Sequence, residues 1–126
     1  LFTTYSDASH GACKATGRAT GGYVTLVSGA AVGWSSKRQP FVTLSSTEAE
    51  FVAAVEAGKE INVAKNPEHH GRMKHLDLRF YWLREAVEEG LIDPLYVSTH
   101  EQVADILTKA VAKKVVEFVV PLLGLE

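Results

Sequence analysis

The chain has 126 residues, of which 46% are hydrophobic and 22% charged, and its formal net charge at pH 7 is −2. This length suits one domain with a single core, so we expect residues 1–126 to fold as one unit. The charge excludes a protein that binds nucleic acid through positive charge over its whole surface, although a local basic patch stays compatible with it. One cysteine, Cys13, excludes an internal disulfide and fits a reducing, intracellular compartment. No apolar run reaches the ~18 residues of a membrane span, so no membrane partner is expected.

The first part of the chain predicts β-structure. Phe2–Ser6 is a short strand that leads to Asp7. Gly22–Val27 and Ala30–Ser35 are runs rich in Val, Tyr and Trp, and Ser28-Gly29 separates them. Two such runs around a two-residue turn are typical of a β-hairpin, which implies an antiparallel pair.

A helix with a polar cap follows the hairpin. Ser45 and Glu48 have the spacing of a capping box, in which a hydroxyl and a carboxylate bind backbone N–H groups at the helix start. Apolar residues then recur at helical spacing, at Ala49, Val52, Ala53 and Ala57. We expect the helix to end before Pro67, because the residue before a proline is disfavoured in the α conformation.

Downstream of this helix the pattern predicts a further helix and a strand. Apolar residues at three- and four-residue intervals predict a helix over Lys74–Glu89, and Gly90 is a natural stop. Leu91–Ser98 is predicted to be a strand, in which Pro94 assigns the first half to an edge or entry position.

The chain closes with a third predicted helix and an apolar tail. This helix begins at Thr99, with Gln102 as its capping-box partner. The tail Val115–Leu125 is strongly apolar, so it requires a partner surface within the domain or in a neighbouring one. Helices that alternate with strands in this order predict an α/β fold.

Three acidic residues stand at informative places: Asp7, Glu50 and Asp105. Each also has an ordinary structural explanation. Asp7 starts a turn, Glu50 favours the helix dipole as Glu48 does, and Asp105 faces solvent in an ion pair with Lys109 at i+4. No one of the three indicates a function on its own.

A series of segments along the chain favours a functional explanation of these acids over the structural one. The segments are Tyr5–Ala8, Gly21–Val24, Val32–Gln39, Leu44–Phe51, Ala64–Pro67, Arg72–Asp77 and Glu101–Lys109. In this order, and over nearly the whole chain, they resemble the ribonuclease H domain at the C-terminal end of copia-type retrotransposon polyproteins.

The resemblance implies an α/β, ribonuclease H-like mixed sheet, with an antiparallel hairpin plus parallel strands flanked by helices. Residues 1–126 would then be the C-terminal piece of a longer polyprotein, with an upstream reverse transcriptase domain as partner. The implied activity is cleavage of the RNA strand of RNA–DNA hybrids by two bound Mg²⁺ (or Mn²⁺) ions, which activate water and stabilise the leaving oxygen. The implied location is intracellular, in a cytoplasmic particle or the nucleus.

The resemblance also assigns the acids. Asp7, Glu50 and Asp105 match the family's catalytic, metal-binding carboxylates, and oxygen ligands are what hard divalent ions prefer. Glu50 is chosen over Glu48 because the family's acid-aromatic-x-Ala pattern falls on Glu50–Ala53. Glu48 is then left as the cap partner.

Other residues are assigned to nucleic acid with less support from the pattern. Lys37 and Arg38 follow the hairpin and could contact phosphate, the alternative being a solvated turn. The resemblance makes His75 a candidate for a backbone contact and His100 a candidate for proton transfer, the alternative for His100 being a solvated helix start. Trp34 is interpreted as hairpin core rather than as a base-stacking platform.

The chain also departs from the family. There, a longer stretch with a parallel strand that ends in an Asp-Asn pair lies where Ile61 here runs directly into Asn62. We therefore expect one central parallel strand and its metal-binding aspartate to be missing, and Leu91–Ser98 to pair with the first strand in a four-stranded sheet. Asp77 is interpreted as structural, and Asp93 lies at the wrong end of its strand, so neither replaces the absent ligand.

With three acids left, the expected activity is reduced or lost. The alternatives are a catalytically dead remnant that still binds nucleic acid by shape, and a non-functional fragment of a transposon polyprotein.

Overall fold

The computed structural model describes residues 2–11, 15–65 and 83–125. Its elements, in chain order, are β1 (Phe2–Ser9), β2 (Thr20–Val27), β3 (Ala30–Arg38), α1 (Ser46–Lys65), the 3₁₀ helices η2 (Thr99–Glu101) and η3 (Val103–Leu107), and α3 (Lys113–Leu122). Residues 83–88 are also helical. Within the described ranges, none of the helices has both the length and the apolar character to cross a membrane.

The strands form an antiparallel sheet in the order β1-β2-β3. The predicted hairpin is confirmed, and its turn residues Ser28 and Gly29 both have positive φ, at 52° and 83°. Such a turn matches the right-handed twist of the flanking strands. The register sets Asp7 of β1 opposite Gly22 of β2, and Gly22 opposite Ser36 of β3.

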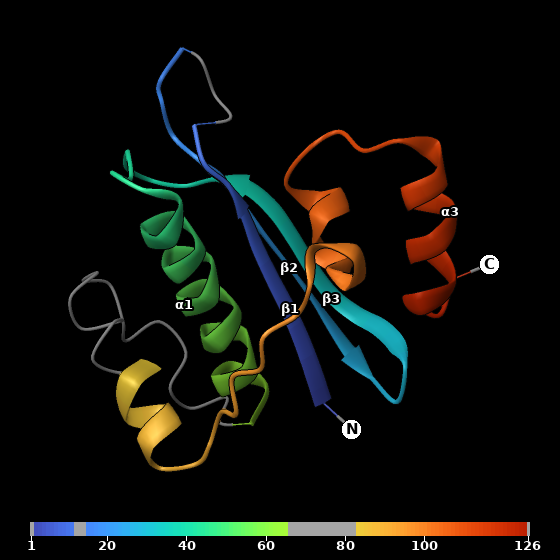
Figure 1. The fold of residues 1–126 in the computed structure, drawn as a ribbon. Coiled ribbons are helices and arrows are strands. Elements are labelled where there is room, and N and C mark those ends of the chain that lie inside the picture. Colours follow the sequence, from blue (N-terminus) through green and yellow to red (C-terminus); the bar gives the residue numbers. More distant parts are fainter. Residues whose placement is uncertain (1, 12–14, 66–82, 126) are drawn as a thin grey trace.

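Helical elements cover both faces of the sheet (Figure 1): α1 lies against β1 and β2 on one face, and η3 covers the other. The predicted apolar face of α1 is confirmed, because Ala49, Val52, Ala53 and Ala57 are all buried. Small side chains let the helix approach closely, and a Cβ at Gly21 would lie 3.9 Å from the Cβ of Ala53.

Part of the apolar tail finds its partner surface within the chain, whereas Phe118, Leu122 and Leu125 stay exposed. Val119 and Leu123 of the α3 region join Val24, Leu26 and Val103 in a buried cluster between the sheet and the C-terminal elements. The backbone N–H of Ala31 donates to the carbonyl of Leu123 at 2.9 Å. This end of the tail is therefore tied to β3.

Two predictions for the C-terminal third were wrong. Leu91–Ser98 forms no strand: residues 92–98 are irregular, and the side chains of Leu95 and Tyr96 are 78% and 92% exposed. Among the described residues there is consequently no parallel strand and no four-stranded sheet, and the expected ribonuclease H-like mixed sheet is reduced to its antiparallel part. The helix expected from Thr99 is split into η2 and η3. The break lies at Gln102, whose side chain donates to the carbonyl of Ser6 and caps η3.

The helix predicted over Lys74–Glu89 is described only in its last part. Residues 83–88 are helical and Gly90 has φ +77°, which confirms the predicted stop. The rest of that prediction, with His75 and Asp77, lies outside the described residues.

Side chains, rather than a neighbouring strand, bind the outer edge of β1 near Asp7. The Gln102 amide donates to the carbonyl of Ser6 at 3.0 Å, and the N–H of Ala8 donates to the Glu50 carboxylate at 3.2 Å. Because backbone groups at a sheet edge need partners, these contacts replace part of a missing ladder. An open cavity of about 1580 Å³ borders the remaining edge, but none of the three acids lines it.

Candidate carboxylate site

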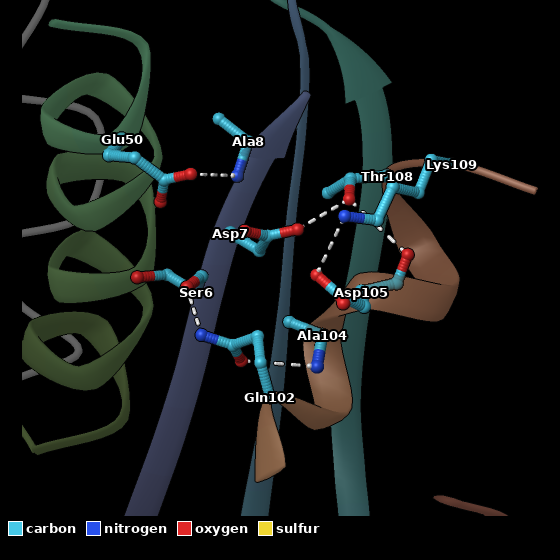
Figure 2. Close-up of polar contacts among 9 residues, drawn as sticks. All are labelled: Ser6, Asp7, Ala8, Glu50, Gln102, Ala104, Asp105, Thr108 and Lys109. Atoms are coloured by element: carbon cyan, nitrogen blue, oxygen red, sulfur yellow. Dashed lines mark hydrogen bonds and ion pairs between the residues drawn. The ribbon is translucent and has the colours of Figure 1, made fainter. Parts of the chain in front are cut away.

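Asp7 lies within β1, two residues before the strand ends, instead of following the strand as predicted. Its side chain is only 9% exposed, on the sheet face that η3 covers. The hydroxyl of Thr108 donates to Oδ2 of Asp7 at 2.6 Å (Figure 2). A buried carboxylate needs such a donor, because an unpaired charge in the interior is costly.

Glu50 is carried by the first turns of α1, and the helix start explains its direction. Ser45 accepts a hydrogen bond from the N–H of Glu48 at 3.1 Å, as the capping box predicts. The Glu48 carboxylate accepts from the N–H of Leu44 at 2.9 Å, one residue away from the predicted partner. Glu48 is thus the cap acid, whereas Glu50 crosses to the N–H of Ala8 on β1.

Asp105 lies in the middle of η3 and is 7% exposed, so the interpretation of a solvent-facing acid was wrong. The predicted ion pair is confirmed, with Nζ of Lys109 at 3.5 Å from Oδ1 of Asp105. Gln102 caps this short helix by accepting from the N–H of Ala104 at 3.2 Å. The same amide binds Ser6, so β1 and η3 are tied together beside the acids.

Two of the three carboxyl groups, those of Glu50 and Asp105, have raised pKa values. Glu50 is an exposed residue, but partial desolvation of its carboxyl, followed by the charge of Asp7, raises its pKa from 4.5 to about 7, although the hydrogen bond from Ala8 lowers it. The pKa of Asp105 is raised by burial first, then by a hydrogen bond and charge interaction with Asp7, while Lys109 lowers it. Asp7 is therefore the shared neighbour, with Glu50 on one side and Asp105 on the other.

This arrangement sets a limit on how a cation could bind. In the part of the chain that the structure describes, no group of three or more His, Cys, Asp or Glu side chains is arranged to hold one metal ion. The acids fit instead as two pairs that share Asp7, and Mg²⁺ usually takes only one or two protein carboxylates, with water and substrate phosphate completing its shell. Each pair offers carboxylate oxygens, which are suitable donors for such an ion. A bound ion would have to share Asp7 with the hydroxyl of Thr108 and Asp105 with the ammonium of Lys109, because these groups already contact the two acids.

The other predicted site residues are spread around this cluster. Lys37 and Arg38 are exposed at the end of β3, at the same end of the sheet as Asp7 and two strands away. Trp34 is 66% exposed on β3, so its assignment to the core was wrong: β3 is an edge strand, and the C-terminal elements leave this side chain uncovered. His100 is exposed on η2.

Asp77 and Asp93 were considered as replacements for the missing metal-binding aspartate, and neither joins the three acids in the described structure. Asp93 is exposed and lines the cavity beside β1. Asp77 and the candidate nucleic-acid contact His75 lie outside the described residues.

Sequence reasoning missed Thr108 and the importance of Gly22. A Cβ at Gly22 would lie 2.8 Å from the Cβ of Leu107 and 3.0 Å from Cγ2 of Thr108. The absence of a side chain at Gly22 thus lets the end of η3 approach the sheet. Nothing in the sequence pairs residues 22 and 108, although Thr108 does follow Asp105 by three positions.

The chain is similar in sequence to known transposon proteins. It is 34% identical over 152 aligned residues to the retrovirus-related Pol polyprotein from transposon TNT 1-94 of Nicotiana tabacum. This alignment covers 99% of this chain and 11% of the tobacco protein. It is 30% identical over 137 residues to the Pol polyprotein from transposon RE1 of Arabidopsis thaliana, covering 86% of this chain and 9% of that one. A putative transposon Ty5-1 protein of Saccharomyces cerevisiae is 52% identical over 61 residues, which is 48% of this chain and 20% of the yeast protein.

These homologues support an origin in a retrotransposon polyprotein, of which the chain spans about a tenth of the length. The tobacco alignment has 152 positions and this chain has 126 residues, so the tobacco sequence carries at least 26 residues with no counterpart here. That agrees with an internally shortened chain. No protein-family model matches the sequence. No solved structure matches it either.

Proposed function

We propose that the chain is the ribonuclease H domain of a copia-type retrotransposon polyprotein, and that it cleaves the RNA strand of RNA–DNA hybrids with reduced activity. The observation that carries the proposal is the meeting of Asp7, Glu50 and Asp105, which come from β1, α1 and η3. The polyprotein homologues support the same lineage. The domain would act inside the cell, in a cytoplasmic particle or the nucleus, beside the upstream reverse transcriptase domain.

In this proposal each acid has a separate task. Divalent ions, when bound, supply polarisation of the scissile phosphate and activation of water. Asp7 would contribute to both carboxylate pairs, Glu50 would complete one of them and Asp105 would complete the other. Lys37 and Arg38 would bind phosphate at the same end of the sheet, and His100 is proposed for proton transfer. Activity would be reduced because the described residues bring no fourth acid to this cluster and because Lys109 already neutralises part of the charge of Asp105.

A cleavage assay tests the proposal directly. A hybrid with end-labelled RNA is incubated with the chain in Mg²⁺ or Mn²⁺, beside the variants Asp7→Asn and Asp93→Asn. Asp93 is a matched control because it is an exposed aspartate outside the acid cluster. We expect slow cleavage by the wild type and Asp93→Asn, and none by Asp7→Asn. Equal cleavage by Asp7→Asn would show that the acid cluster is not the active site.

The alternative, a catalytically dead remnant that still binds nucleic acid, is favoured by one observation: protein groups already contact all three acids. It predicts no cleavage but salt-dependent binding of the hybrid in a gel shift at two salt concentrations. Replacing Arg38 by Gln should then lower the slope of log affinity against log salt by about 1. A fragment without function would bind no hybrid and cleave none.

A further inference from the structure

The end of η3 is seated on the sheet at the point where Asp7 faces Gly22. Thr108 is 4% exposed, and its Cγ2 would be 3.0 Å from a Cβ at Gly22, which stands opposite Asp7 in the register. On the far side of Gly22, the hydroxyl of Ser36 donates to the carbonyl of Leu107. Its burial, and the hydrogen bond to the neighbouring backbone at Leu107, restrict the rotamers of the Thr108 side chain.

The Thr108 hydroxyl has one proton and two neighbouring acceptors. Oδ2 of Asp7 is 2.6 Å away and the carbonyl oxygen of Asp105 is 3.3 Å away. The proton goes to the carboxylate, because the shorter, charge-assisted hydrogen bond is the stronger of the two. A carboxylate that accepts this bond through one oxygen has its orientation restrained and keeps its second oxygen for another partner.

A second contact supports the same geometry from below (Figure 2). Gln102 donates to the carbonyl of Ser6, next to Asp7, and accepts from the N–H of Ala104, next to Asp105. The two acids therefore lie between two links that join β1 to η3. Gln102 binds backbone groups, at Ser6 and Ala104. Of the two links, only the one from Thr108 contacts a carboxylate, that of Asp7, which faces the other acids.

We propose that Thr108 is a positioning residue that fixes the carboxylate of Asp7 for divalent-cation binding. The inference rests on the proposed function, since it assigns to Thr108 a role at the same site. Groups that orient a ligand without touching the ion alter metal affinity about 10- to 100-fold when they are removed. Thr108 would act through Asp7 and would not itself touch substrate or ion.

Isothermal titration with Mn²⁺ tests this without any cleavage assay. The variants are Thr108→Val, which keeps the shape and removes the donor, and Thr108→Ser, which keeps the donor. Thr43→Val is the matched control, because Thr43 is also buried and its hydroxyl lies 3.2 Å from Nδ1 of His10 rather than binding one of the three acids. We expect Thr108→Val to bind Mn²⁺ at least about 10-fold more weakly. Thr108→Ser and Thr43→Val should bind like the wild type.

The outcomes separate this inference from the proposed function. If the wild type binds no Mn²⁺, both fail together. If the wild type binds and Thr108→Val binds as tightly, the positioning role fails while the proposed function stands. If Thr43→Val or Thr108→Ser weakens binding as much as Thr108→Val, the effect is a general loss of packing and the positioning role also fails. Should Thr108→Val not fold, Thr108→Cys, a weak donor of similar size, takes its place with the same expected loss.

Discussion

Replacing Gly22 by Ala should destabilise the chain by pushing the end of η3 off the sheet. The added Cβ would lie 2.8 Å from the Cβ of Leu107, 3.0 Å from Cγ2 of Thr108 and 3.3 Å from the carbonyl oxygen of Ser35. A Cβ is fixed to its backbone, so η3 itself has to move. Overpacking of this kind costs about 1–3 kcal/mol. The lower entropy of the unfolded chain returns about 0.4–1 kcal/mol, which leaves a net loss of roughly 1–2 kcal/mol.

Gly33 offers the matched control, because it also lies in the hairpin and a Cβ there would meet nothing within 4 Å. Gly33→Ala should keep only the gain from the unfolded state. We expect thermal unfolding, followed by circular dichroism, to show the Gly22→Ala midpoint lowered by roughly 4–8 °C. The Gly33→Ala midpoint should be unchanged or slightly raised. If Gly22→Ala melts at or above Gly33→Ala, the close seat of η3 on β2 is refuted.

Three further predictions concern Glu50, Gly124 and Ser45. The folded state raises the pKa of Glu50 from 4.5 to about 7. Between these pH values the folded chain therefore retains a proton that the unfolded chain releases. In metal-free protein the contribution of Glu50 to stability is full below pH 4.5 and is lost as the pH rises towards 7. Urea unfolding at several pH values should show this fall, and a Glu50→Gln variant with the same slope would contradict it. Gly124 has φ +73° and a Cβ there would lie 2.8 Å from the carbonyl oxygen of Gly29, so Gly124→Ala should lower the free energy of unfolding by about 1–3 kcal/mol; an unchanged urea midpoint would argue against the docking of the tail on the hairpin. Ser45→Ala should cost about 1 kcal/mol through loss of the cap, measured against Ser46→Ala, and equal values for the two variants would rule out the cap.

Local spacing was enough to predict the features that depend on neighbours in sequence. The two-residue turn at Ser28 predicted the hairpin, and the spacing of Ser45 and Glu48 predicted the start of α1. The separation of four residues between Asp105 and Lys109 predicted their ion pair. Each of these depends on backbone geometry or on contacts within about one turn. The resemblance added the three acids as a group, which composition and spacing alone did not join.

The remaining features depended on which surfaces meet in space. A strand forms only beside a partner strand; residues 92–98 are irregular, and near Asp7 the side chains of Gln102 and Glu50 bind the β1 edge instead. Trp34 is exposed because the C-terminal elements leave it uncovered, which its own segment cannot reveal. The contact between Thr108 and Asp7 joins residues 101 positions apart and depends on the space left at Gly22. The order of residues thus determined the local elements and the identity of the acids, whereas only packing decided which hydroxyl, amide and ammonium groups hold them.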